Sequence, residues 1–269
     1  MSKKLKIILK YTLIFTECIL STILISLIAL SFTILNKNYI LNHLNKTNYY
    51  TNTYNDIRKE MNYYTAPSGF KEDILDDTFN TGDIKNDTKK LINNIFKGKK
   101  IEIDTSKFIE KLNKKIDNYI ETENFKVVNY DEVHKFSTEM SKIYIDKVKL
   151  YYYPDKIVNK IYKLKKITPK LILLITILLS GLLLISKKIY KKIDLSIICF
   201  FNTFILLFIN YYIKNRIDIN NLFIVNDTAS KVLQSITSSI FNLMIIIAIL
   251  SFIFGLTNNI FKKTRLLKK

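Results

Sequence analysis

Four apolar segments, each long enough to cross a bilayer as a helix, constrain the fold of this chain more than any other feature. Crossing the hydrocarbon core takes about 20 mainly apolar residues in a helix. The segments cover residues 12–35, 167–186, 193–213 and 236–257. The first is longer than the apolar part of a secretory signal peptide, and no A-x-A-like cleavage site follows it. We therefore predict an all-α membrane protein with four transmembrane helices and an uncleaved first anchor.

Clusters of basic residues flank the four segments and predict their orientation. They lie in residues 1–11, in the short link 187–192 and in the tail 258–269. With four spans, these three places share one side of the membrane. Basic residues near transmembrane ends favour the cytoplasmic side, so the sequence predicts a multi-pass plasma-membrane protein with both termini in the cytoplasm. We also expect the inner lysines to attract anionic lipid headgroups.

The same orientation places residues 36–166 and the loop 214–235 outside the cytoplasm. Residues 36–166 hold 19 acidic and 25 basic side chains, a net charge of +6 within a chain total of +19. The charge excess therefore lies mainly on the cytoplasmic side, and its distribution indicates membrane topology and no nucleic-acid partner. The abundance of Lys, Asn, Ile, Tyr and Phe, all with AT-rich codons, suggests a low-GC Gram-positive bacterium.

Residues 36–166 read as a helical extracytoplasmic domain between the first and second spans. Apolar side chains recur at helical spacing in 106–122 and in 131–152, and the pattern returns after Pro154. The first span is expected to continue outward as a stalk. The alternation in 98–104 would suit a short strand. These patterns predict a small bundle of four or five helices.

The acid-rich stretch "DILDDTFNTGDIKND", residues 73–87, has two interpretations. Dense carboxylates bind calcium, but an EF-hand loop starting at Asp77 would place Phe79 and Thr88 at ligand positions. The second interpretation is a helix–turn–helix in which Ser68 caps a first helix and Asp83 opens the next. Its buried residues would be Phe70, Ile74 and Phe79, followed by Ile84, Leu91, Ile92 and Ile95. We favour this second interpretation.

Glu17 is an acid inside the first span, and polar groups within a membrane are candidates for function. Asn202 and Asn242, in the third and fourth spans, are its expected partners, together with a lysine near the cytoplasmic face. Three roles remain open for Glu17: reaching headgroup water, coupling to a proton or ion, and holding helices together.

Other chemistry finds little support in the sequence. Cys18 and Cys199 are expected to be small apolar residues within spans. His43 and His134 lie about 90 residues apart, without the spacing of a zinc site. Motifs of nucleophilic or metal hydrolases and phosphate-binding loops are absent from the sequence. We expect no catalytic residue, no metal, no cofactor and no enzymatic activity.

The order of parts, one span, a large outer domain and three further spans, resembles permease subunits of the macrolide-exporter and cell-division mechanotransmitter class. That resemblance of topology implies a cytoplasmic ATPase as partner. The segment "SGFKEDILDDTF…GKKIEID" is similar to uncharacterised four-span membrane proteins of low-GC Gram-positive bacteria, which implies no activity.

Taken together, the sequence favours a non-enzymatic accessory, sensing or scaffolding protein of the envelope, with an envelope protein as partner. A permease-like subunit that works with an ATPase is the alternative.

Overall fold

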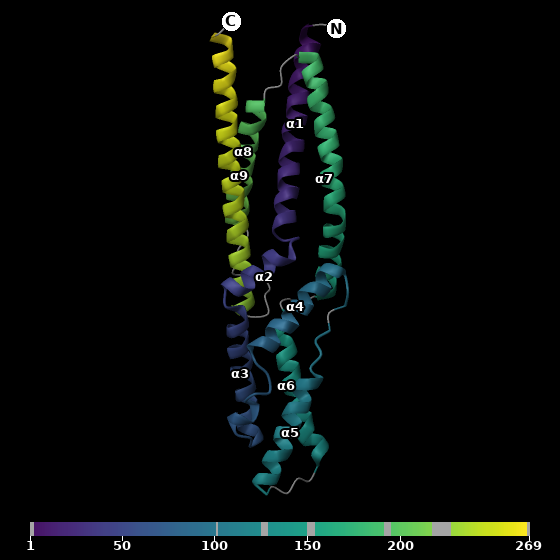
Figure 1. Cartoon of the computed structure of the whole chain (residues 1–269), viewed down its shortest axis with the longest axis vertical. Helices are drawn as coiled ribbons and strands as arrows, with labels where there is room; N and C mark the ends of the chain where they lie inside the picture. Colours follow the sequence, from purple (N-terminus) through teal and green to yellow (C-terminus); the bar gives the residue numbers. More distant parts are fainter. Residues whose placement is uncertain are drawn as a thin grey trace. The chain divides into compact units, whose positions relative to one another are not determined.

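The computed structural model describes residues 3–100, 102–124, 129–149, 154–190, 195–216 and 227–267. In these residues the chain forms nine α-helices and one 3-10 segment, and no strand. The elements are α1 (Lys3–Phe32), α2 (Lys37–Lys46), α3 (Tyr49–Ser68), η1 (Glu72–Leu75), α4 (Thr81–Lys97), α5 (Ser106–Thr122), α6 (Tyr130–Val148), α7 (Pro154–Tyr190), α8 (Leu195–Arg216) and α9 (Asp227–Leu267), and Figure 1 shows their course.

The chain divides into two compact units, which we describe separately. The membrane unit contains α1, α8, α7 from Lys163 onward and α9 from Ile236 onward. The helical unit contains α2 from Ile40 onward, α3 to α6 with η1, the start of α7 up to Tyr162, and the start of α9 up to Ser235.

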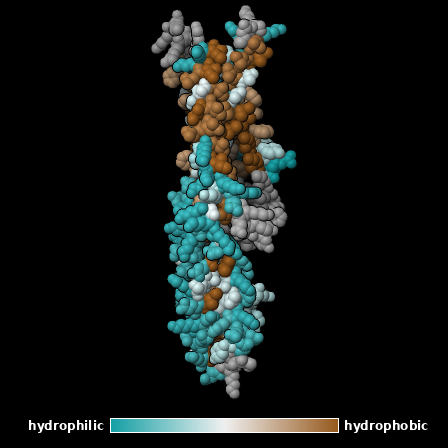
Figure 2. All heavy atoms as spheres, turned by 90° about the vertical axis from the view of Figure 1, so that its right-hand side faces the viewer, coloured by the Kyte–Doolittle hydropathy of each residue, from teal (hydrophilic) through white to brown (hydrophobic). Residues whose placement is uncertain are grey.

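Four helices are long and apolar enough to cross a membrane, which confirms the prediction of four spans. The candidate spans are Lys4–Phe32, Val158–Tyr190, Leu195–Arg216 and Asp227–Phe261. Large apolar side chains remain exposed along all four helices. Figure 2 shows the resulting brown, hydrophobic surface of the membrane unit, whereas the surface of the helical unit is mostly teal. Such a continuous apolar surface is suited to contact with lipid.

Two of these helices extend beyond the predicted spans. α7 continues to Tyr190, through the first part of the expected link 187–192, whose remaining residues lie outside the described ones. α9 begins at Asp227, so the last nine residues of the expected loop 214–235 are helical, and it continues to Leu267 through most of the expected tail.

The helical unit has a hydrophobic core of its own, formed by α3, η1, α4, α5 and α6. The buried core residues are Ile57, Met61, Ile74, Leu75, Phe79, Ile84, Phe108, Leu112, Ile116, Ile120, Met140, Tyr144 and Val148. The helical faces predicted for 106–122 and for the described part of 131–152 supply seven of these residues, because apolar side chains three or four positions apart share one face of a helix. Tyr151, the last expected member of the second face, lies outside the described residues.

The second helix of the predicted helix–turn–helix forms as α4, two residues earlier than expected. Asn80 caps it: its Oδ1 accepts hydrogen bonds from the backbone N–H groups of Gly82 and Asp83, at 2.7 and 3.1 Å. The Asp83 carboxylate accepts in turn from the backbone N–H of Asn80 at 3.0 Å, which completes a capping box. At the other end, Gly98 takes a left-handed conformation (φ +65°), and a Cβ there would lie 2.8 Å from the Tyr162 ring.

Four local predictions were wrong for the described residues. Ser68 ends α3 instead of capping a new helix, because Gly69 follows it in the left-handed conformation (φ +78°) that closes helices. The residues expected to form the first helix of the pair make only the 3-10 segment η1. The first span does not continue as a stalk, since α1 ends at Phe32 and separate helices follow. The short strand is not formed in the described residues of 98–104.

Candidate functional site

Glu17 is buried in the membrane unit, with 1% of its surface exposed. Its Oε1 accepts a hydrogen bond of 2.5 Å from the hydroxyl of Ser186, near the end of α7. Among the described residues, no ion pair involves Glu17. We expected Glu17 to pair with Asn202, Asn242 or a lysine. The described residues do not form this pairing. The partner is a serine.

Asn202 lies in α8 and is 4% exposed. Its Oδ1 accepts hydrogen bonds from the hydroxyls of Ser21 and Thr22 of α1, at 3.0 and 2.7 Å. Glu17 and Ser21 are four residues apart and therefore share one face of α1. One helix thus carries polar contacts to two others: Glu17 to α7, and Ser21 and Thr22 to α8.

Asn242, the third predicted site residue, is exposed on α9 and is not part of these contacts. The α8–α9 contact depends on other groups. Asn210 donates to the backbone carbonyl of Phe241 at 2.8 Å, and Thr203 donates to that of Ala248 at 3.1 Å. These polar contacts of the membrane unit hold pairs of helices together, as interhelical hydrogen bonds do in lipid.

Ser186 differs from the two threonines of α7. The hydroxyls of Thr168 and Thr176 donate to the carbonyls four residues earlier in their own helix, both at 2.7 Å. Ser186 instead donates across to α1. No sequence pattern indicated this role, because a serine in an apolar helix most often bonds to its own backbone.

The two cysteines follow the sequence interpretation. Cys18 is buried beside Glu17 in α1, and Cys199 is partly buried in α8; both thiols are free.

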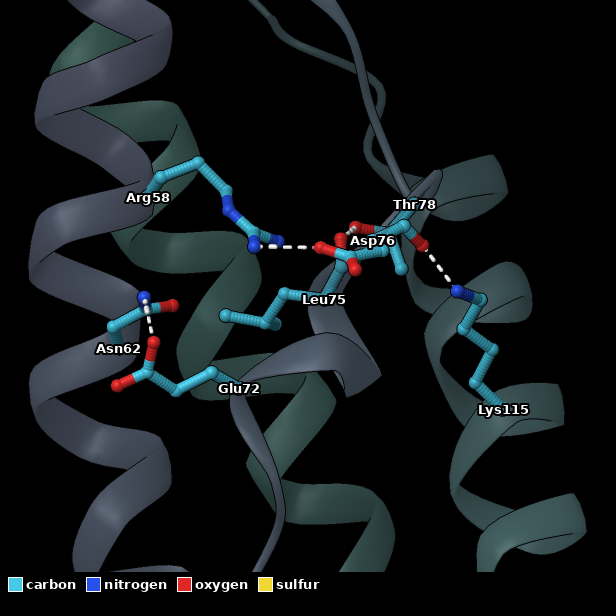
Figure 3. A network of polar contacts seen from close by, with 7 residues as sticks. All are labelled: Arg58, Asn62, Glu72, Leu75, Asp76, Thr78 and Lys115. Atoms are coloured by element: carbon cyan, nitrogen blue, oxygen red, sulfur yellow. Dashed lines mark hydrogen bonds and ion pairs between the residues drawn. The ribbon is translucent and has the colours of Figure 1, made fainter.

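The acids of the stretch 73–87 bind other parts of the protein. Asp76 Oδ1 lies 2.6 Å from Nη2 of Arg58, and the Asp76 carbonyl accepts from Lys115, as Figure 3 shows. In the same figure Asn62 donates to Glu72 at 3.0 Å. Asp83 belongs to the capping box described above, and Asp87 accepts from the Tyr144 hydroxyl at 2.8 Å. The Asp76 carboxylate thus binds α3 and the Asp87 carboxylate joins α4 to α6, whereas the contact with α5 is made by the Asp76 backbone carbonyl.

The two histidines, His43 and His134, lie in α2 and α6 of the helical unit. His43 is 5% exposed, and its Nδ1 lies 2.9 Å from the Ser235 hydroxyl. Burial lowers the pKa of His43, and the neighbouring Lys46 lowers it further. His134 Nε2 lies 3.1 Å from Asp117. Within the described part of the chain, no group of three or more His, Cys, Asp or Glu residues is placed to hold a metal ion.

The helical unit has a pocket of about 290 Å³ that is bordered in part by the core residues Phe79, Phe108 and Tyr144. Burial, with the hydrogen bond to Asp87, raises the pKa of the Tyr144 phenol. The carboxylates of its rim already accept hydrogen bonds: Asp87 from Tyr144, Asp83 from Asn80, and Asp104 from the backbone of Ser106. The remaining lining is polar and includes Lys90, Lys107 and Lys111, so this pocket is a polar recess beside the core whose carboxylates already have partners within the protein.

The helical unit also has an opening that the sequence interpretation did not identify. It is an open cleft of about 570 Å³ lined by Asp56, Lys59, Glu60, Tyr63, Tyr64, Lys147 and Asp227. We call it the tyrosine cleft. Five of its seven residues come from α3, one from α6 and one from the start of α9. The available signal was the spacing of the α3 residues, which places them in one stripe along the helix.

No protein-family model, curated protein or solved structure matches this chain.

Proposed function

We propose that this protein is a non-enzymatic accessory protein of the plasma membrane, with a sensing or scaffolding role that it performs through its helical unit. The tyrosine cleft carries the proposal. Tyr63 is 77% exposed and Tyr64 is 48% exposed, and both line this cleft, whereas most other apolar residues of the unit lie in or against its core. Aromatic side chains are enriched where proteins meet partners, because they contribute large contact areas.

The proposed orientation places both termini in the cytoplasm and the helical unit outside. The basic residues at the ends of the spans support it, through their preference for the cytoplasmic side. Cysteine labelling of a variant without Cys18 and Cys199 tests this orientation. A membrane-impermeant maleimide should label Glu121→Cys in intact cells and should label Lys188→Cys only after lysis. Reversed labelling would contradict the proposal.

The proposed role is tested with a photo-crosslinking amino acid placed at Tyr64 of the full-length protein in living cells. We expect a discrete cross-linked product with an envelope component. The matched control carries the same group at Glu121, which is exposed on α5 and does not line the cleft. A product at Glu121 alone, or at neither position, would contradict a binding role of the cleft.

A second candidate function is that of a permease-like subunit that passes the movement of a cytoplasmic ATPase across the membrane. The observation that favours it is that α7 and α9 each run without a break from residues of the helical unit into residues of the membrane unit. This candidate predicts that an ATPase co-purifies with the full-length protein from mild detergent. Purification that repeatedly yields the protein alone would exclude it.

A further inference from the structure

Helix α3 carries two stripes of side chains with different roles. Thr53, Ile57, Met61 and Thr65, at spacings of four residues, are buried. The second stripe consists of Asp56, Lys59, Glu60, Tyr63 and Tyr64, and it lines the tyrosine cleft. The first stripe explains how α3 packs in the helical unit. The second stripe is charged and aromatic, and packing of the core does not account for its two exposed tyrosines.

Part of the charge in the cleft is already neutralised within the protein. Lys147 Nζ lies 2.5 Å from Glu60 Oε2, and the Thr228 hydroxyl donates to Asp56 Oδ2 at 2.7 Å. These contacts join α6 and α9 to α3 and give the cleft fixed walls. Lys59 and Asp227, both exposed, supply one ammonium and one carboxylate of opposite sign.

The two tyrosines form an aromatic surface of defined shape. Their ring centroids lie 5.6 Å apart and the ring planes meet at 90°. Leaving this much aromatic surface in water gives up the free energy that burial would provide. The rings are therefore available to stack against an apolar surface of a ligand.

The charges of the lining decide which class of ligand fits. Since Glu60 and Lys147 pair with each other, an anion would meet the carboxylates of Asp56 and Asp227, and a cation would meet the ammonium group of Lys59. A neutral ligand rich in hydroxyl groups suits both, because a hydroxyl donates to carboxylates and accepts from ammonium groups. Sugar rings also have apolar C–H faces, which stack on aromatic rings.

We infer that the tyrosine cleft binds a neutral glycan chain, with sugar rings stacked on Tyr63 and Tyr64 and hydroxyls bonded to the charged walls. The cleft is open and its volume of about 570 Å³ lies within the range of about 300–1,000 Å³ usual for ligand pockets. An open cleft admits a segment of a polymer. The inference rests on the proposed function, in which the helical unit faces the envelope, and it names the ligand class of that site.

The test uses the full-length protein in a detergent without a sugar headgroup, because glucoside and maltoside detergents would compete for the cleft. The probes are a β-1,4-linked N-acetylglucosamine hexamer and a β-1,4-linked glucose hexamer, and binding is measured by calorimetry. We expect Tyr63→Ala and Tyr64→Ala each to weaken binding about tenfold or more, as loss of a central aromatic contact does. Tyr63→Phe keeps the ring and should retain affinity within about threefold.

Tyr130→Ala is the matched control, because Tyr130 is 52% exposed on α6 and does not line the cleft. This variant should bind as the parent does. Circular dichroism checks that each variant keeps its helix content, so that lost binding is not lost folding. Absence of binding to both sugars, or binding that Tyr63→Ala leaves unchanged, would overturn the inference.

An oligolysine peptide distinguishes a glycan site from a surface for basic polypeptides. We expect it not to bind. If it binds, and Tyr63→Ala abolishes that binding while neither sugar binds, the cleft is a peptide site and the glycan inference is wrong. A photo-cross-link from Tyr64 to an envelope protein, without any sugar binding, would leave the proposed function standing and overturn only the glycan inference.

Discussion

The Ser186 hydroxyl of α7 donates a hydrogen bond of 2.5 Å to the carboxyl of Glu17 in α1, although the two residues are 169 positions apart in the sequence. Both side chains are at least 96% buried. An acid in this environment depends on its hydrogen-bond partner, because neither water nor lipid replaces a lost donor.

We therefore expect Ser186→Ala to lower the free energy of unfolding by about 1–3 kcal/mol, the usual effect of leaving a buried polar group without its partner. Thermal unfolding in detergent, followed by circular dichroism, measures this effect. The double variant Glu17→Leu/Ser186→Ala should recover most of the loss, since replacing both partners by apolar groups is often nearly neutral. Thr176→Val is the control, because Thr176 bonds only to its own helix and is exposed. Equal losses in Ser186→Ala and the control would contradict this account.

Gly255 predicts a second effect within the membrane unit. A Cβ at this position of α9 would lie 3.1 Å from Cys199 and 3.1 Å from Phe200 of α8. Small residues allow membrane helices to approach closely, so Gly255→Leu should separate α8 and α9 and cost about 1–3 kcal/mol. Gly181→Leu is a matched control, since nothing lies within 4 Å of the corresponding Cβ in α7. The thermal midpoint should fall for Gly255→Leu only; a similar fall in both variants would count against a close α8–α9 contact.

His43 predicts a dependence of stability on pH. Burial lowers its pKa in the folded protein below the ordinary value of 6.5, so the unfolded chain takes up a proton first as the pH falls. The contribution is present above the ordinary pKa of 6.5 and is lost as the pH falls below it, through the lowered pKa of the folded state. His43→Asn cannot titrate and should show a shallower loss over this range, measured by unfolding at several pH values.

Ser235→Ala separates titration from hydrogen bonding at this site. It removes the hydroxyl that lies 2.9 Å from His43 Nδ1 but keeps the imidazole. This variant should lose stability while keeping a dependence on pH. If His43→Asn showed the same slope as the parent protein, His43 would not be the titrating group.

Asn80 predicts a local effect at the start of α4. Asn80→Ala removes the acceptor for the N–H groups of Gly82 and Asp83 and should cost about 1 kcal/mol, whereas Asn80→Asp should be tolerated. Hydrogen exchange of the first turn of α4 measures this effect, with the amides of α5 as an internal reference. Faster exchange in α5 as well would indicate a global effect instead of a cap.

The sequence predicted those parts of the fold that depend on composition and local periodicity. The four spans follow from length and hydropathy, and Phe108, Leu112, Ile116 and Ile120 are buried as their helical spacing indicated. The error at Ser68 was avoidable, because Gly69 is a typical residue after a helix end. The end of α1 at Phe32 had no comparable signal in the sequence.

The candidate sites were harder to predict because they depend on tertiary contacts. Glu17 and Asn202 were recognised as unusual polar residues, but their partners are hydroxyl residues, which are common in any apolar helix. The tyrosine cleft joins residues of α3, α6 and α9, and no local pattern brings these together.

The tetrapeptide Asn-Tyr-Tyr-Thr occurs twice around α3, at 48–51 and 62–65, and its first tyrosine has opposite surroundings in the two copies. Tyr49 is fully buried and Tyr63 is 77% exposed. We expect substitutions of Tyr49, Ile57 and Met61 to lower the cellular abundance of the protein, and substitutions of Tyr63 and Tyr64 to weaken ligand binding in the cleft. A saturation library of α3 can be sorted once for expression level and once for a growth phenotype. The buried stripe should respond in the first sort and the cleft stripe in the second, which would identify the functional surface before any ligand is known.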